Sequence, residues 1–214
     1  GEYYPQTSGD GLIDILTIQY MHLEDYLRAG GVVMVPLALV SLSMWLLIVD
    51  RALFFRRLHH KNMNLKTALD HIRHNRMPDP TQYRGAVSLL VARFLMRRSN
   101  DRQLDQFILD ETVLTINRGL KDYLAVIGVL AAVAPLMGLL GTVTGMIGTF
   151  DILSVFGTGN AKGMAGGISE ALITTQTGLL VAIPGLYMKG FLDRRARNLQ
   201  QRVARAGYYI KRHL

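Results

Sequence analysis

The sequence predicts an all-α membrane protein with three transmembrane helices and long helical extensions outside the bilayer. Three stretches carry no formal charge or a single one: residues 29–49, 123–150 and 163–188. Each is long enough to cross a bilayer, since a helix of about 20 predominantly apolar residues suffices. No segment shows the alternating apolar and polar pattern of a strand, so helices account for the predicted fold.

The composition agrees with a membrane protein. Of the 214 residues, 50% are hydrophobic, 21 are glycine, and the mean hydropathy is +0.20. Soluble domains of this length are seldom so apolar. Cysteine is absent, which excludes a disulfide framework and a thiolate metal site.

The formal charge of +8 is unevenly distributed along the chain. Residues 51–123 contain 14 Lys or Arg against seven acids, and residues 189–214 contain eight against one, whereas residues 1–30 contain five acids and one base. Because short loops rich in Lys and Arg stay in the cytoplasm, we expect the N-terminus outside and the C-terminus inside. This topology accounts for the arginine clusters, so we expect anionic lipid headgroups as their partners rather than nucleic acid.

These observations divide the chain into seven segments. They are an outer segment with an interfacial amphipathic helix (1–28), the first span (29–54), a cytoplasmic helical loop (55–122), the second span (123–150), a short outer turn (151–162), the third span (163–190) and a cytoplasmic helix (191–214). The amphipathic stripe of the first segment is Ile13, Leu16, Tyr20, Leu23 and Leu27. The stretch from Asp101 has no strong helix breaker before Pro135, so we expect it to run unbroken into the second span.

Four glycines at spacings of 3, 4 and 3 line one face of the second span: Gly138, Gly141, Gly145 and Gly148. They form a groove in which a neighbouring backbone can approach closely. Pro135 is placed to kink the helix and free a carbonyl. Beside the groove, the hydroxyls of Thr142 and Thr149 can bond a partner helix, water or a proton carrier. These residue types also serve packing alone in membrane helices, and that alternative stays open.

Glu170 is the only formal charge between Lys162 and Lys189. Ionisable side chains within a span are costly and usually mark an ion path, a proton relay or a buried counter-ion. At about 100° per residue, Thr174 and Thr177 share its face, so this face can line a wet cavity. In the alternative interpretation the helix begins near Ser169 and leaves Glu170 in its first turn, where acids are favoured.

Other chemistries receive little support. Asp70, His71 and His74 have a helical spacing that can bind a metal, but such a cluster in a polar loop is usually a solvated face. No Ser/His/Asp set, Walker loop or pair of carboxylates stands at a readable spacing. We therefore predict neither an enzyme nor a bound cofactor or metal.

Two segments resemble the paired helices of the MotA/TolQ/ExbB proton-channel family: APLMGLLGTVTGMIGTF (134–150) and GGISEALITTQTGLLVAIPG (166–185). Three spans, the AGGVVMVP start of the first span (29–36) and the Asp50-Arg51 pair at its end are most similar to the ExbB branch. The match is tight over these segments and consists chiefly of topology over the rest of the chain.

The resemblance implies a subunit of a homo-oligomeric ring in the bacterial inner membrane, a pentamer with its N-terminus in the periplasm. It also implies a small ExbD-like membrane partner inside the ring, which carries an essential aspartate. Proton flow would move this partner and energise a TonB-like protein that drives transport across the outer membrane.

The family's pore glutamate matches Glu170, and its two pathway threonines match Thr142 and Thr175. A second set of residues would line the pore beside them: Thr174, Thr177, Thr149 and Pro135. Thr174 and Gln176 depart from the family pattern, which often has small or aliphatic residues there, and they make this helix more polar.

A proton relay across some 30 Å needs several titratable groups or waters, and this chain offers one carboxylate. The second must come from another chain or be replaced by a file of waters. Two further interpretations stay open: a TolQ-like motor subunit serving envelope integrity, and a passive scaffold whose acid fixes helix packing. Sodium in place of protons is also open.

Overall fold

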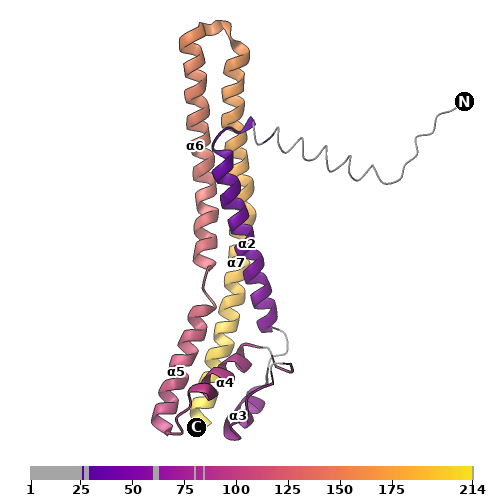
Figure 1. Cartoon of the computed structure of the whole chain (residues 1–214), viewed down its shortest axis with the longest axis vertical. Coiled ribbons are helices and arrows are strands. Elements are labelled where there is room, and N and C mark those ends of the chain that lie inside the picture. The colour runs from indigo at the N-terminus through magenta and orange to yellow at the C-terminus, as the bar shows by residue number, and fades with distance from the viewer. Residues whose placement is uncertain (1–25, 27–28, 60–62, 80, 84, 214) are drawn as a thin grey trace, which may run out of the picture. The chain divides into compact units, whose positions relative to one another are not determined.

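The computed structural model describes residues 26, 29–59, 63–79, 81–83 and 85–213 (Figure 1). Its elements are α2 (Met34–His59), α3 (Leu65–Arg73), α4 (Ala86–Arg97), α5 (Arg102–Gly119), α6 (Leu124–Phe156), the 3-10 turn η1 (Gly157–Gly159) and α7 (Ala161–His213). The described residues contain no strand. The amphipathic stripe predicted from Ile13 to Leu27 lies outside them.

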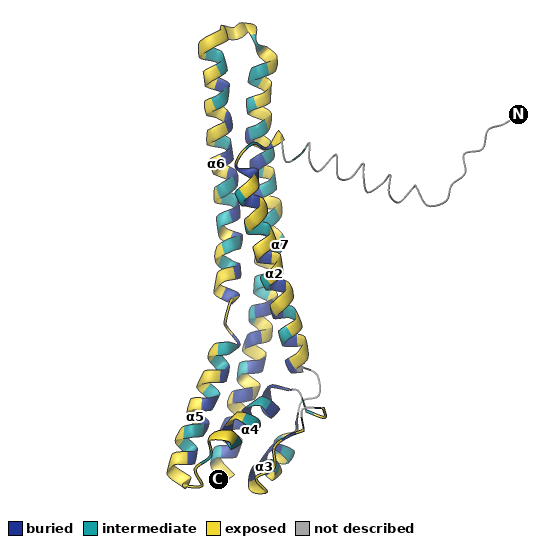
Figure 2. Cartoon of the chain, in the orientation of Figure 1, coloured by how far each residue is buried: buried dark blue, intermediate teal, exposed yellow. Residues whose placement is uncertain are grey.

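Three helical stretches are long and apolar enough to cross a membrane: Met34–Leu58 in α2, Arg102–Gly159, which includes α5 and α6, and Ala161–His213, which is α7. The prediction of an all-α fold with three candidate spans is thereby confirmed. Exposed residues recur along these helices in the single chain (Figure 2). Many of them are large and apolar, including Leu46, Leu139 and Leu180. Surfaces of this kind meet lipid or other protein chains.

The described chain forms two compact units. Of the described residues, those before Met44 and those in Leu130–Pro184 make up the first unit, and those in Met44–Val129 and from Gly185 onward make up the second. The first unit thus takes the start of α2, most of α6 and the first part of α7. The second takes the remaining parts of these helices together with α3, α4 and α5.

In the first unit, α6 and α7 are joined by η1 and run antiparallel beside each other (Figure 1). Their contact with α2 is an apolar cluster of Met34, Leu37, Ala134 and Ala182, with Tyr26, Val40, Met137 and Val181 packed against it. The short side chains of the two alanines let α2 approach both helices of the hairpin.

The hairpin turn is shorter than the predicted outer segment of residues 151–162. The α6 helix continues to Phe156, and α7 begins at Ala161 after a turn that includes Asn160. Asn160 caps α7, since its Oδ1 accepts a hydrogen bond from the Gly163 N–H at 3.0 Å. The α6 helix also continues through Pro135, although proline cannot donate the usual backbone hydrogen bond.

In the second unit, the last part of α7 packs through a stripe of apolar residues that recur at spacings of 3 and 4. Its members are all buried: Leu192, Ala196, Leu199, Val203, Ala206 and Ile210. Gln200 Nε2 donates to the Asn117 carbonyl of α5 at 2.8 Å. A Cβ atom on Gly207 would lie 2.6 Å from Val113 Cγ2, so α5 and α7 meet closely at this glycine.

The expectation of an unbroken helix from Asp101 into the second span is wrong. The α5 helix ends at Gly119, and α6 begins at Leu124 after a turn in which Tyr123 has φ +63°. A left-handed tyrosine is unfavourable, so neighbouring contacts must stabilise it. Arg51 provides them: its guanidinium lies 4.5 Å from the Tyr123 ring centroid, and its Nη1 donates to the Gly119 carbonyl at 3.4 Å.

Candidate functional site

Glu170 lies well inside a helix, as the tenth residue of α7 counted from Ala161. The alternative in which the helix begins near Ser169, with Glu170 in its first turn, is therefore wrong. The side chain is half-buried. Within the described part of the chain, its carboxylate has no hydrogen-bonding or ion-pair partner. The structure thus holds an uncompensated carboxylate on the third candidate span.

The carboxylate of Glu170 lies against the turn that precedes α2. Gly31 in this turn has φ +68°, and a Cβ atom placed on it would overlap Glu170 Oε1 and lie 2.5 Å from Cδ. Met34 and Leu37, which follow the turn, belong to the apolar cluster with α6 and α7. The first span therefore contributes backbone, rather than a polar side chain, to the surroundings of the acid.

The glycines of α6 lie at the contact with α7, with one exception. A Cβ atom on Gly138 would lie 3.0 Å from the Thr174 carbonyl oxygen, one on Gly141 would overlap the Thr174 side chain, and one on Gly145 would lie 2.8 Å from the Gly167 carbonyl oxygen. A Cβ atom on Gly148 would have no neighbour within 4 Å. Three of the four predicted glycines thus allow close backbone approach.

The matching surface on α7 is also built from small residues, and the sequence reasoning missed it. A Cβ atom on Gly178 would lie 2.7 Å from the Ala134 carbonyl oxygen, and one on Gly167 would overlap Thr149 Oγ1. Ala171 is buried between them. The spacing of 4 and 7 residues from Gly167 through Ala171 to Gly178 is the signal that could have revealed this face.

The threonines of α6 differ in exposure. Thr142 is half-buried, and its hydroxyl donates to the Leu139 carbonyl at 2.6 Å. Thr149 is buried, and its hydroxyl donates to the Gly145 carbonyl at 3.0 Å. The surroundings of Thr149 favour a packing role, whereas Thr142 keeps part of its surface open to other chains or water.

On α7, Thr174 is fully buried against α6, and its hydroxyl donates to the Ala171 carbonyl at 2.9 Å. Thr175 links the two helices, since its hydroxyl lies 3.1 Å from the Gly138 carbonyl oxygen. Thr177 instead faces the segment before α2, where its hydroxyl lies 2.8 Å from the Tyr26 phenol oxygen. Glu170, Thr174 and Thr177 therefore meet three different surroundings and do not line one open cavity within the chain.

Gln176 is an exposed amide in the middle of an apolar surface. Leu172, Leu179 and Leu180 around it are exposed as well. It lies six positions after Glu170, so at about 100° per residue the two side chains point about 120° apart. An amide at this depth needs a partner with hydrogen-bonding groups.

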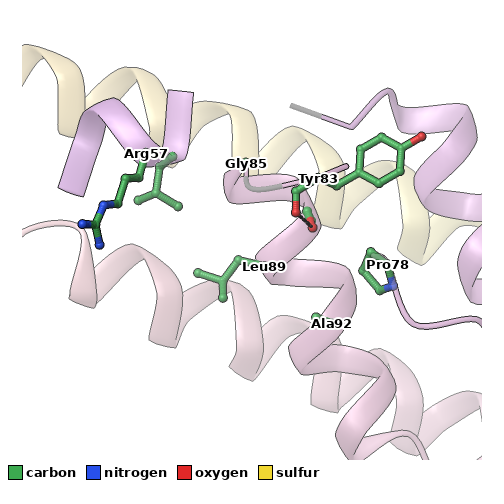
Figure 3. A pocket seen from close by; sticks show the side chains of 8 residues that line it. Arg57, Pro78, Tyr83, Gly85, Leu89 and Ala92 are labelled. Carbon is green, nitrogen blue, oxygen red and sulfur yellow. Dashed lines mark hydrogen bonds between the residues drawn. The ribbon is translucent and has the colours of Figure 1, made fainter. Parts of the chain in front are cut away.

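The second unit contains an open groove of about 680 Å³ (Figure 3). Its lining residues are Arg57, Leu58, Pro78, Tyr83, Gly85, Ser88, Leu89 and Ala92. None of the predicted site residues belongs to it, and Arg57 is the one charged residue among the described residues that line it. The His71 and His74 rings bond to carbonyls of their own helix, and the described residues contain no metal-binding cluster of His, Cys, Asp and Glu.

These features define an integral membrane protein with an ionisable side chain, Glu170, inside its third candidate span, an arrangement typical of ion and proton pathways. The model of the MotA/TolQ/ExbB proton channel family matches residues 65–205. The chain belongs to this family and is ExbB-like. The matched region includes Thr142, Glu170 and Thr175 and excludes α2.

Named relatives agree with the family. The chain is 34% identical over 173 residues to an ExbB-like biopolymer transport protein of Synechocystis sp., which covers 75% of this chain and 66% of the relative. A second ExbB-like protein of Synechocystis sp. is 32% identical over 165 residues, which are 74% of this chain and 79% of the relative. The biopolymer transport protein ExbB of Salmonella typhimurium is 29% identical over 197 residues, which span 82% of this chain and 76% of the relative. The chain is thus an energy-transducing membrane subunit of the MotA/TolQ/ExbB type, a family that is not a known enzyme class.

Proposed function

We propose that this chain is the proton-channel subunit of an inner-membrane complex that energises transport across the outer membrane. It acts in a homo-oligomeric ring, a pentamer by family resemblance, around an ExbD-like membrane protein, and it drives a TonB-like transducer. Its N-terminus is periplasmic and its C-terminus is cytoplasmic. The observation that carries the proposal is Glu170, a carboxylate inside the third span of a chain from a proton-channel family.

The position of Glu170 supports a role in proton transfer. A carboxylate that forms no ion pair can take up and release a proton without first breaking one. Because Glu170 is the only acid in the three apolar stretches 29–49, 123–150 and 163–188, the next station must be a group of the partner protein or a water file. Thr142 and Thr175 complete the pathway in this proposal, since both are half-buried hydroxyls on the two helices beside the acid.

The exposed surfaces of the spans support assembly into a ring. Lipid can cover exposed leucines, but it offers no hydrogen-bonding groups to Gln176. A second copy, the partner protein or a water-filled lumen satisfies that amide. Membrane helices commonly associate through such polar side chains.

The experiment that tests the proposal is proton flux in vesicles that contain the purified chain and its small partner. Glu170→Gln should reduce proton flux to the level of empty vesicles, because the amide cannot take up and release a proton as the carboxylate does. The assembled complex should stay intact. Asp151→Asn is the matched control, since Asp151 is an exposed acid that follows the predicted second span. Unchanged flux in Glu170→Gln would remove this residue from the mechanism.

Two further measurements separate the alternatives. Absence of flux in the wild-type complex would favour a passive scaffold, and flux that follows a sodium gradient would identify the other ion. In cells that lack their own ExbB-like and TolQ-like subunits, the proposal expects restored TonB-dependent uptake. Restored envelope integrity without restored uptake would favour a TolQ-like subunit.

A further inference from the structure

The turn before α2 is shaped around the carboxylate of Glu170. A Cβ atom on Gly31 would overlap Oε1, lie 2.5 Å from Cδ and lie 3.2 Å from Cγ, so the whole end of the Glu170 side chain rests on this glycine. The φ of +68° at Gly31 is a conformation that glycine adopts readily and other residues adopt at a cost. The backbone conformation of the turn therefore favours glycine, and a side chain at this position would displace the Glu170 carboxylate.

A second contact ties the same segment to the same face of α7. The Tyr26 phenol oxygen lies 2.8 Å from Thr177 Oγ1, seven residues or about two turns beyond Glu170. The Thr177 hydroxyl also donates to the Ile173 carbonyl at 2.7 Å. Since that hydroxyl has one hydrogen, Tyr26 is the donor of the bond between the two side chains.

The segment is also fixed to the hairpin by packing. The Gly30 N–H donates to the Tyr26 carbonyl at 3.2 Å, and the Met34 N–H donates to the Gly31 carbonyl at 3.2 Å. Met34 then enters the apolar cluster with Ala134 and Ala182. Hydrogen bonds and apolar contacts thus hold Tyr26 and Gly31 in place against α7.

We propose that Gly31 and Tyr26 are positioning residues for Glu170, which hold its carboxylate in a resting seat formed by the turn before α2. The carboxylate leaves this seat when it exchanges a proton with a partner chain. This consequence rests on the proposed function, which the inference deepens. The seat itself is the backbone of Gly31, and the Tyr26–Thr177 hydrogen bond, about two turns farther along α7, fixes the segment that carries it. The carboxylate is therefore held by steric fit. None of the described cationic side chains forms an ion pair with it.

The seat can be tested without transport, by following modification of Glu170 with a hydrophobic carbodiimide in the purified full chain. Mass spectrometry of the peptide that contains Glu170 gives the rate. Gly31→Ala should raise this rate about tenfold, because the added methyl displaces the carboxylate and shifts its population to the unseated state. Tyr26→Phe, which removes one hydroxyl, should raise the rate by a smaller factor and keeps the test available if Gly31→Ala does not fold.

Gly157→Ala is the matched control for backbone strain. Gly157 has φ +60°, close to that of Gly31, but a Cβ atom there would meet nothing within 4 Å. Its substitution should leave the modification rate of Glu170 unchanged. Equal rates in Gly31→Ala and Gly157→Ala, whether both raised or both unchanged, would overturn the inference.

A double substitution isolates the contact itself. Aspartate at position 170 is one methylene shorter and withdraws its carboxylate from the added methyl of Gly31→Ala. The effect of Gly31→Ala on the modification rate should therefore disappear in the Glu170→Asp background. If the effect persists in that background, Gly31 does not act through its contact with the Glu170 carboxylate. Loss of proton flux in Glu170→Gln together with rates insensitive to Gly31 would reject the seat and retain the proposed function.

Discussion

Arg51 is a charged residue whose neighbours are mostly aromatic rings and backbone. It is 8% exposed, and its guanidinium lies 5.0 Å from the Phe54 ring centroid and 4.5 Å from that of Tyr123. Its Nε is 3.7 Å from Asp50 Oδ2, too far for a hydrogen bond, and is buried without a hydrogen-bonding partner. Stacking and the bond to the Gly119 carbonyl therefore outweigh the incomplete hydrogen bonding of this side chain.

We expect Arg51→Met to lower the free energy of unfolding by about 1–2 kcal/mol, because it removes two cation–π contacts and a hydrogen bond. Arg51→Lys should recover only part of this loss, since lysine lacks a planar group that stacks on both rings. Denaturant unfolding in detergent measures the change. Arg56→Met, at an exposed position of the same helix, should stay within about 0.5 kcal/mol of wild type, and an equal loss there would contradict the prediction.

Asp79 accepts hydrogen bonds from the Thr81 backbone N–H at 2.9 Å and from the Thr81 hydroxyl at 2.8 Å. The backbone bond first and the hydroxyl second hold the pKa of Asp79 below its ordinary value. A lowered folded-state pKa means that the charged group stabilises this turn above the ordinary pKa. That stabilisation is lost as the pH falls through the folded-state pKa.

We expect Thr81→Ala to raise the pKa of Asp79 part of the way to its ordinary value, because the backbone donor remains while the hydroxyl is removed. A pH titration of the Asp79 carboxyl carbon by NMR measures this change. Thr115→Ala on α5, which leaves both donors in place, serves as the control. An unchanged titration in Thr81→Ala would show that the hydroxyl contributes nothing.

At the scale of the element, α6 and α7 form a hairpin in which backbone approaches backbone. A Cβ atom on Gly145 would lie 2.8 Å from the Gly167 carbonyl oxygen and 2.9 Å from the Ala171 nitrogen. Neither atom can move without shifting the helix. Small residues on both helices are therefore the condition for this packing, which holds Glu170 and Thr175 at fixed heights along the hairpin.

Gly145→Ala should lower the free energy of unfolding by about 1–3 kcal/mol, the usual cost of overpacking. Gly148→Ala is the matched control on the same helix, because a Cβ atom there meets nothing within 4 Å. It should be neutral or slightly stabilising, since alanine is the better helix former. Unfolding of both variants in detergent gives the comparison, and equal losses would show that close approach is not the cause.

At the scale of the whole molecule, the candidate spans expose apolar and polar side chains that have no partner within the described part of the single chain. Gln176 illustrates this, because its amide lies among exposed leucines on the side of α7 away from Gly138 and Gly141. A hydrogen bond between membrane helices contributes about 0.6–2 kcal/mol. In the proposed ring, we expect a neighbouring copy, rather than the partner protein or lumen water, to supply that bond.

We therefore expect Gln176→Met, which keeps the size of the side chain and removes its amide, to weaken self-association by about 0.6–2 kcal/mol per contact. Dissociation of the oligomer on dilution in detergent measures the loss. Leu179→Met, an apolar exchange at an exposed neighbour, should leave dissociation unchanged. If both variants dissociate alike, Gln176 does not lie at the contact between copies.

Local patterns in the sequence were enough to predict the three apolar stretches, the glycine groove of α6 and Glu170 as the lone acid of those stretches. These features depend on residues near one another in the chain, where helical periodicity relates spacing directly to a shared face. The same local patterns, together with the family motif, selected Glu170, Thr142 and Thr175.

Only the tertiary structure decided which faces meet. It placed Gly31 against Glu170, Tyr26 against Thr177 and Gly167 and Gly178 against α6, and it separated Thr174 from the acid's surroundings. It also broke the helix at Tyr123, where contacts from Arg51 stabilise a backbone conformation that propensity disfavours. Close approach between segments that are distant in the sequence depends on the size and orientation of the side chains on both segments. Helical periodicity describes the faces of one segment at a time.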